Sequence, residues 1–96
     1  MTLLDPDVVL RADATAVALG DTAETRGATP VAQFFKGRAQ LARTALVNGR
    51  VGVVVAPKGR LLLVLLPVVV GGRIIEIDVV ADPARLAALE LGVFDS

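Results

Sequence analysis

Two dipeptides that favour tight turns do most to limit what this chain can fold into. Asn48-Gly49 and Gly71-Gly72 each separate two runs rich in β-branched residues. These runs cover residues 44–47, 50–56, 60–70 and 73–80. Asn and Gly tolerate the positive φ of the primed turns that join adjacent antiparallel strands. Because Pro57-Lys58-Gly59 links the two pairs, the second half of the chain predicts a meander of four consecutive antiparallel strands.

The third of these runs has the composition of a central strand. From Leu61 to Val70 neither alternating face carries a polar side chain, which predicts cover on both sides by helices, another sheet or a second subunit. Pro67 has no N–H for a ladder, so we expect it at an edge position or a bulge, where the strand bends. The fourth run alternates apolar with acidic residues, as half-buried strands do. Its apolar residues are Ile75, Ile77 and Val79, and its acids are Glu76 and Asp78.

Proline follows a capping residue at two places, and each pair predicts the start of a helix. Thr29-Pro30 opens an amphipathic helix that we expect to end near Arg43. Asp82-Pro83 opens a short last helix with Leu86 and Leu89 on one side. Both helices are therefore expected to bury one apolar side.

The first part of the chain completes the expected fold. Residues 8–12 and 16–19 predict two short strands across a turn near residues 13–15, before a polar loop at residues 20–27. The order is then strand, strand, helix, four strands and a short helix. It defines an α+β fold, a curved antiparallel sheet wrapped around a helix. The length of 96 residues suits a single domain, residues 1–96.

The composition excludes several classes of function. Hydrophobic residues make up 54% of the chain, enough for a core. Ten basic residues balance ten acidic ones, so there is no basic surface for direct nucleic-acid binding. Without Cys or His, no disulfide or usual zinc ligand set is available, and we expect no metal and no cofactor. The longest apolar stretch is too short to cross a membrane, and the N-terminus lacks an export signal, which predicts a cytoplasmic protein.

Three segments resemble a known family in their order and spacing. They are residues 4–13, which contain Leu10-Arg11-Ala12-Asp13, residues 45–57, which contain Asn48-Gly49, and residues 72–86, which end in Asp82-Pro83-Ala84-Arg85-Leu86. Together they resemble the C-terminal SnoaL-like domain of bacterial extracytoplasmic-function RNA polymerase sigma factors. The resemblance covers nearly the whole chain, and its two end motifs are the more specific ones.

The resemblance implies a cone like that of nuclear transport factor 2, in which a curved sheet wraps around helices and leaves a cavity. Complete domains of this fold have helices ahead of the first strand, whereas only four residues precede Asp5-Pro6 here. We therefore expect a SnoaL-like domain that lacks the N-terminal helices and is a C-terminal fragment of a longer protein. Without those helices part of the apolar concave face is uncovered, which predicts a homodimer.

The resemblance also implies a function and a partner. In such sigma factors this domain follows the two promoter-reading domains and tunes their activity. It implies a non-catalytic regulatory domain that modulates transcription initiation by docking on the promoter-binding domains of sigma or on core RNA polymerase. The resemblance places the terminal motif, with Asp82, Pro83, Arg85 and Leu86, at the partner. Arg11 and Asp13, which share a face of the first strand and can point into the cavity or to solvent, are further candidate partner-binding residues.

The chain departs from the family pattern at both end motifs. The family's terminal motif is commonly Asn-Pro-Asp-Lys-Leu, and residues 82–86 keep its Pro, a basic residue and Leu but place Asp and Ala at the other two positions. Where the family has a glycine-rich turn, this chain has Ala14-Thr15-Ala16-Val17. The same residues also have structural interpretations. Asp82-Pro83 can simply begin a helix, and Arg11 and Asp13, two apart on a strand, can form a surface ion pair.

An enzyme or a small-molecule-binding domain is the alternative function. The same fold houses polyketide cyclases and steroid isomerases that move a proton with a carboxylate in an apolar cavity. Glu76 and Asp78 share a face, and two neighbouring carboxylates in a pocket would raise the pKa of one of them. Asp13 is a further candidate base. Phe34 and Phe35 are either core aromatics or the wall of a pocket for an apolar ligand.

Overall fold

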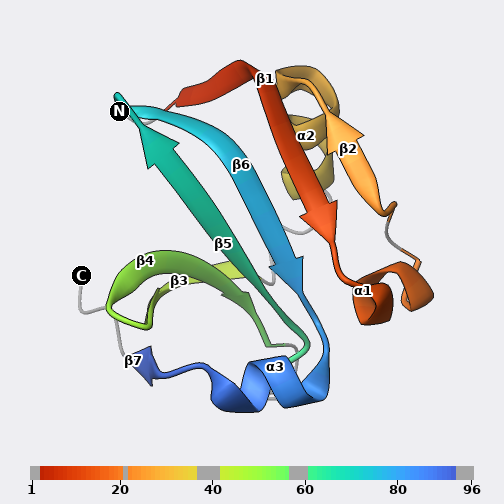
Figure 1. Cartoon of the computed structure of the whole chain (residues 1–96), viewed down its shortest axis with the longest axis vertical. Helices are drawn as coiled ribbons and strands as arrows, with labels where there is room; N and C mark the ends of the chain where they lie inside the picture. Colours follow the sequence, from red (N-terminus) through yellow and green to blue (C-terminus); the bar gives the residue numbers. More distant parts are fainter. Residues whose placement is uncertain (1–2, 21, 37–41, 57–60, 93–96) are drawn as a thin grey trace.

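Strands that are far apart in the sequence meet in one sheet. The computed structural model describes residues 3–20, 22–36, 42–56 and 61–92, which form seven strands and three helices (Figure 1). The strands are β1 (Leu3–Ala12), β2 (Glu24–Arg26), β3 (Ala42–Val47), β4 (Arg50–Val55), β5 (Leu63–Val70), β6 (Arg73–Val80) and β7 (Leu91–Gly92), and the helices are α1 (Ala14–Ala18), α2 (Ala28–Lys36) and α3 (Pro83–Ala88). In the sheet the strands lie in the order β2-β1-β6-β5-β4-β3-β7.

The predicted meander is confirmed. β3 pairs with β4, β4 with β5 and β5 with β6, each antiparallel. The turn after β3 has φ of 52° at Asn48 and 81° at Gly49, and the turn after β5 has φ of 58° at Gly71 and 77° at Gly72. Both dipeptides thus have the positive φ values of primed turns. The predicted linker at residues 57–59 lies outside the described residues.

β1 makes the sheet mixed rather than antiparallel, so that part of the predicted fold class is wrong. It pairs with β6 in parallel, with Leu10 opposite Ile77 and Ala12 opposite Val79. Local alternation identifies a strand but says nothing about a partner more than 60 residues away. The pairing follows from burial, because Leu10 and Ile77 are both fully buried in the same core.

Two further predictions for the first part of the chain are wrong. Residues 16–19 do not form a strand, because α1 covers Ala14–Ala18, where alanine favours a helix and Asp13 caps its start. The predicted loop at residues 20–27 contains β2, which pairs antiparallel with β1. Backbone bonds from Ala12 N to Ala23 O (3.0 Å) and from Gly27 N to Val8 O (2.8 Å) extend this contact.

α2 begins earlier than the sequence predicts. The N–H of Val31 donates to the carbonyl of Gly27 (3.2 Å), so helical bonding starts before Thr29, and Pro30 lies in the first turn, where its missing N–H costs little. The described helix ends at Lys36. Arg43 belongs to β3, which makes the prediction of a helix reaching that residue wrong, while residues 37–41 lie outside the described part.

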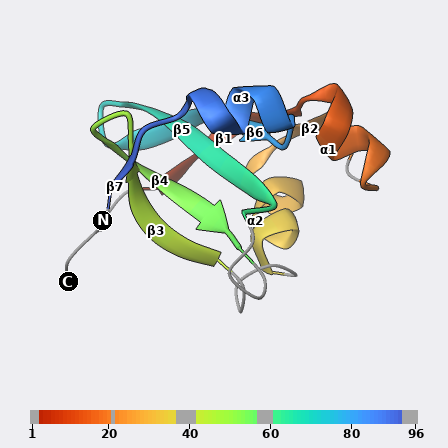
Figure 2. The ribbon, with the colours of Figure 1, turned by 90° about the horizontal axis from the view of Figure 1, so that it is seen from below.

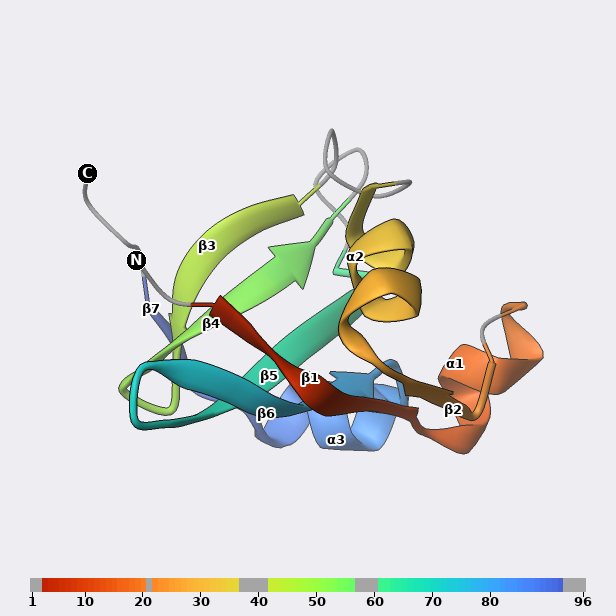
Figure 3. The same ribbon diagram turned by 90° about the horizontal axis from the view of Figure 1, so that it is seen from above.

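The sheet curves around α2, as the sequence predicts. Figures 2 and 3 show α2 within the curve and α3 on the outer side of the sheet. On the α2 side, the largest fully buried side chains of the core cluster come from β1, α2, β5 and β6, and they are Val8, Leu10, Val31, Leu65, Ile77 and Val79. In the described residues, no helix is long and apolar enough to span a membrane.

β5 is the middle strand of the sheet, as predicted, but it is covered along only half of its length. Its first three residues, Leu63, Val64 and Leu65, are buried. Residues 68–70 are 41–58% exposed in the single chain, so the described helices and strands do not cover this part, and the cover by a second subunit stays a prediction. The strand stops pairing with β4 after Leu65, two residues before Pro67. A bulge in the β5–β6 ladder follows at residues 68–69.

Candidate protein-docking site

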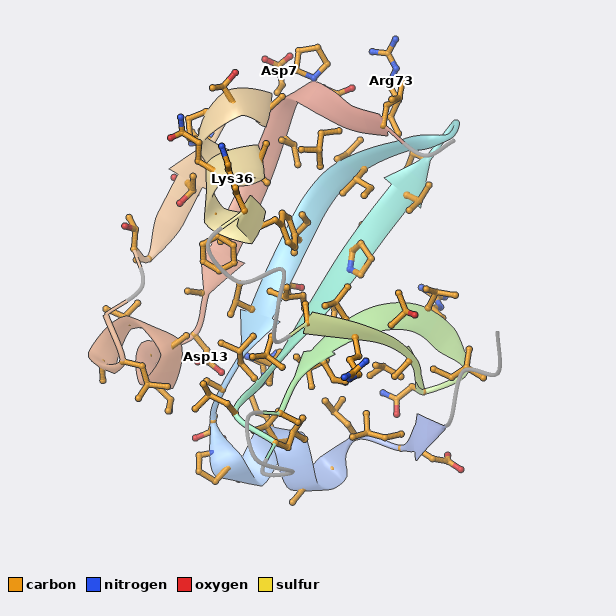
Figure 4. The ribbon with its side chains drawn as sticks, turned by 180° about the vertical axis from the view of Figure 1, so that it is seen from behind. Asp7, Asp13, Lys36 and Arg73 are labelled. Atoms are coloured by element: carbon orange, nitrogen blue, oxygen red, sulfur yellow. The ribbon has the colours of Figure 1, made fainter. Side chains whose placement is uncertain are left out.

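Asp13 lies where three elements meet, at one corner of the sheet. It directly follows β1, and its Oδ1 accepts a hydrogen bond from the backbone N–H of Ala16 (2.9 Å), which caps α1. Its own N–H donates to the carbonyl of Val79 in β6 (3.0 Å). Figure 4 shows Asp13 between α1 and the start of α3. The side chain is only 11% exposed, so these bonds form largely away from water.

The second oxygen of Asp13 holds the turn between β6 and α3. Its Oδ2 accepts from the N–H groups of Ala81 (2.9 Å) and Asp82 (3.0 Å). The Arg85 Nη1 lies 3.6 Å from the same oxygen. One carboxylate therefore fixes the start of α1 and the start of α3 relative to each other.

Asp82 caps α3, as the sequence predicts. Its Oδ2 accepts from the N–H of Arg85 (3.0 Å), and Pro83 is the first helical residue. The Arg85 side chain is 54% exposed, and Leu86 is half-buried on the same helix. We refer to Asp13, Asp82 and Arg85 as the corner cluster. In this cluster the guanidinium of Arg85 lies beside the carboxylate of Asp13 and is still about half exposed to solvent.

The hydrogen bonds at the corner cluster set the acidity of Asp13. Burial by itself would raise the pKa of this carboxyl group. The N–H groups of Ala16, Asp82 and Ala81 and the charge of Arg85 act in the opposite direction, and the net effect is a pKa below the ordinary value of 3.8. Asp13 is therefore ionised at neutral pH and is not a candidate general base with a raised pKa.

Arg11 belongs to a different group of charges. Its Nη1 donates to Glu76 Oε1, and its Nε lies 3.5 Å from Glu24 Oε1. Glu24 also accepts from Arg26 Nε at 3.0 Å. Bonding to Glu76 and the charge of that carboxylate raise the pKa of Arg11. This strand ladder of Arg26, Glu24, Arg11 and Glu76 crosses β2, β1 and β6 on an exposed surface, apart from the corner cluster.

The predicted pocket residues do not come together. Phe34 and Phe35 pack against the core in an edge-to-face contact with ring centroids 5.8 Å apart. Glu76 pairs with Arg11. Asp78 instead lines a hollow of about 330 Å³ between β4 and β5. Among the described residues no charged side chain is fully buried, and no three acidic side chains gather as metal ligands would.

The structure thus unites the two motifs at opposite ends of the sequence. Asp13 contacts Ala81, Asp82 and Arg85, although Ala81 lies 68 positions further along the chain. Arg11 does not share the cluster with Asp13, because β1 ends at Ala12 and the chain turns into α1. Sequence reasoning missed the backbone donors Ala16 and Ala81, which no side-chain pattern marks. The alanine-rich segment that begins directly after Asp13 is the signal that would have identified the cap.

Sequence analysis also missed a contact that holds the chain after α3. The side-chain Oδ1 of Asn48 accepts from the N–H of Glu90 (2.8 Å), and the N–H of Asn48 donates to the carbonyl of Glu90 (2.8 Å). These bonds lead into the pairing of β7 with β3. The residue that makes the turn after β3 therefore also positions the segment that leaves α3.

A crystal structure with a similar fold comes from a bacterial sigma factor. The crystal structure of the Mycobacterium tuberculosis extracytoplasmic function sigma factor SigJ superposes with a TM-score of 0.62 and 23% sequence identity over 88% of this chain. The chain covers only 36% of that structure's length. No family model and no curated protein matches the sequence. At this identity the likeness shows a shared fold, that of one part of a sigma factor.

Proposed function

We propose that this chain is a non-catalytic regulatory domain of an alternative sigma factor. In this proposal it modulates transcription initiation by docking on the promoter-binding domains of sigma or on core RNA polymerase, in the cytoplasm. The SnoaL-like, cone-shaped fold expected from the sequence is part of the proposal. Two kinds of support exist, the fold shared with part of a sigma factor and the geometry of the corner cluster.

The observation that carries the proposal is the bonding of Asp13 to the start of α3. The segment that contains Leu10-Arg11-Ala12-Asp13 and the segment of residues 82–86 are the two that resemble sigma-factor domains most specifically. Asp13 Oδ2 joins them through the N–H groups of Ala81 and Asp82. Two segments remote in sequence are thus held together, and the Arg85 side chain is exposed beside their junction.

Arg85 is the residue of this surface that is best placed to contact a partner. Asp13 Oδ2 already accepts two backbone hydrogen bonds, and Arg85 lies 3.6 Å away from it, in charge contact but beyond hydrogen-bond distance. Its five N–H donors are thus free to bind an incoming carboxylate or carbonyl. Leu86 supplies an apolar neighbour on the same helix.

A binding measurement tests the proposal directly. The chain is immobilised and titrated with the promoter-binding domains of a sigma factor from the same organism, and separately with core RNA polymerase. We expect binding to at least one of them, and we expect Arg85→Ala to weaken it about tenfold or more. Arg43→Ala, which removes an exposed arginine from β3, is the matched control and should bind like wild type. Absence of wild-type binding to both would contradict the proposal.

The structure gives the enzyme alternative little support. A proton-transfer site needs a carboxylate in a water-poor pocket, whereas Glu76 is engaged by Arg11 and Asp78 is only half-buried. Asp13 has a lowered pKa because of the backbone donors and Arg85. Glu76 and Asp13 therefore lack the environment that a general base of this type requires, and Asp78, at the hollow between β4 and β5, is not enclosed.

A further inference from the structure

A hollow of about 330 Å³ opens where β4 and β5 separate. The two strands pair over only three positions, Val53–Val55 with Leu63–Leu65, whereas β5 and β6 stay paired as far as Val70 and Arg73. Figure 1 shows β4 turning away from β5 beyond this point. Residues from both strands, from β6 and from the end of β3 line the hollow, among them Val47, Arg50, Val51, Leu66, Val68 and Asp78.

Pro67 explains why the ladder ends there. A Cβ built on Gly52 of β4 would lie 3.1 Å from the carbonyl oxygen of Leu65, so the backbone polar groups of Leu65 point toward β4. The N–H of a residue points to the same side as its carbonyl and as those of residues two positions away. Position 67 therefore faces β4 as well, and proline has no N–H to offer. The β4–β5 ladder loses its next donor, and the strands part.

Exposed apolar side chains concentrate around this hollow. Val51 is 53% exposed on β4, and residues 68–70 are 41–58% exposed on β5. Ile75, the extra residue of the bulge in β6, is also exposed. These five side chains are half of the ten exposed large hydrophobic residues in the described part of the chain. Two of them, Val51 and Val68, line the hollow itself, and exposed apolar side chains at a hollow are typical of an interaction site.

The hollow carries one positive and one negative side chain that do not meet. On β4, Arg50 and Val54 share a face, and Val54 pairs with Val64 of β5. On β5, Val64 and Leu66 share a face, and Leu66 pairs with Asp78 of β6. Arg50 and Asp78 therefore lie on the same face of the sheet. β5 lies between their strands, and β4 has parted from β5 at Arg50, so the two side chains are more than two strand spacings, roughly 10 Å, apart. In the described part of the chain neither has an ion-pair partner.

We propose that this hollow is the interface for a second copy of the chain. In a two-fold dimer the same patch is used by both copies, so a contact between residues i and j occurs twice. A patch with one cation and one anion on opposite sides of an apolar hollow is complementary to itself. Arg50 of each copy then pairs with Asp78 of the other, while Val68, which lies on the same face of the sheet, packs across the interface.

This inference is independent of the corner cluster. The homodimer predicted from the sequence would use the open concave face of the sheet. The dimer proposed here uses a different surface, the hollow between β4 and β5. Arg50 and Asp78 belong to neither the corner cluster nor the strand ladder. The dimer and the sigma-factor partner therefore use different residues, and failure of one proposal leaves the other testable.

Charge reversal tests the interface sharply. The oligomeric state is measured by analytical ultracentrifugation from about 1 to about 300 μM, the range in which small interfaces dissociate. We expect wild type to dimerise, and Arg50→Asp or Asp78→Arg to raise the dissociation constant at least about tenfold, because each creates like-charge contacts twice. An equimolar mixture of the two variants should dimerise again, because every cross contact then joins an Asp to an Arg.

Two further variants complete the test. Lys36→Asp makes the same charge change on α2, away from the hollow, and should leave dimerisation unchanged. Val68→Asp introduces a charge at an exposed apolar position and should give a monomer with an unchanged circular dichroism spectrum. This variant tests the interface even if a reversal variant does not fold. A monomeric wild type at every concentration, or a mixture that stays monomeric, would overturn the proposal.

Discussion

At the corner where β1 and β6 end, a single carboxylate ties three elements together, whereas toward the other end of the sheet β4 and β5 separate around an apolar hollow. Asp13 supplies acceptors for the N–H groups of Ala16, Ala81 and Asp82. Pro67 instead removes a donor, and the ladder stops. Both regions belong to the same sheet, so the difference arises from individual polar groups and not from hydrophobicity. A few hydrogen bonds therefore determine that the elements are held together at the Asp13 corner and that β4 and β5 separate toward the other end of the sheet.

The comparison predicts the largest loss of stability at Asp13. Asp13→Ala leaves three backbone N–H groups without their acceptor at a site with little exposure. We expect the free energy of unfolding to fall by about 3 kcal/mol, as measured by urea denaturation. Asp7→Ala removes an exposed acid from the same strand and should cause no measurable change. Equal effects of the two substitutions would show that the corner is not held by Asp13.

The second largest loss of stability is expected at Gly52 of β4, beside the place where β4 and β5 separate. An added Cβ would lie 2.9 Å from the Val47 Cγ2 and 3.1 Å from the Leu65 carbonyl oxygen. Val47 is buried and the carbonyl is fixed in the sheet, so neither yields easily. We expect Gly52→Ala to cost about 2 kcal/mol in unfolding free energy.

A double variant checks the cause of that cost. Val47→Ala removes the nearer of the two atoms, so Gly52→Ala should be less harmful in a Val47→Ala background than in wild type. Strictly additive losses would mean that the carbonyl of Leu65, and not Val47, limits the space. The packing beside the hollow would then depend on the backbone alone.

The two ends also differ in how well they can be predicted from sequence. The turns at Asn48-Gly49 and Gly71-Gly72 follow from residues adjacent in the chain, and so does the cap at Asp82-Pro83. These parts of the fold were predicted correctly because the deciding interactions are local. The parallel pairing of β1 with β6 was not predicted, because it depends on shared burial of residues more than 60 positions apart.

In the corner cluster the sequence predicts the role of Asp82 as the cap of α3, but not that of Asp13. Asp13 and Asp82 were singled out through a family resemblance, yet their connection runs through backbone N–H groups that leave no trace in the sequence. Arg11 was grouped with Asp13 because strand alternation places them on one face. The chain leaves the strand at Asp13, which breaks that alternation. The sequence predicts that Pro67 disturbs its strand. Only the strand register shows that the pairing lost is the one with β4.

Acid should loosen the corner selectively. The pKa of Asp13 is lower in the folded chain than its ordinary value of 3.8, because its backbone donors and Arg85 outweigh the effect of burial. A lowered folded-state pKa contributes stability above that ordinary value, and the contribution is lost as the pH falls below it. The difference in unfolding free energy between wild type and Asp13→Ala should thus be constant from pH 7 to about pH 5 and shrink below about pH 4. A difference that stays constant at low pH would contradict the role of the carboxylate charge.

The smallest change in stability is expected for substitutions in the strand ladder. They compare several exposed charges with the one largely buried carboxylate of Asp13. Arg11 contacts both Glu24 and Glu76, but its side chain is 48% exposed, so water competes for every contact and salt screens the charges. Arg11→Ala should shift the melting temperature by less than about 2 °C, and the shift should vanish in about 1 M NaCl. Glu76→Ala should behave alike, and the double variant should add nothing, because both substitutions remove the same pair. A shift comparable to that of Asp13→Ala would mean that the ladder, and not the corner, holds β1 against β6. The parallel pairing would then depend on surface charge, and the two ends of the sheet would differ less than their hydrogen bonds indicate.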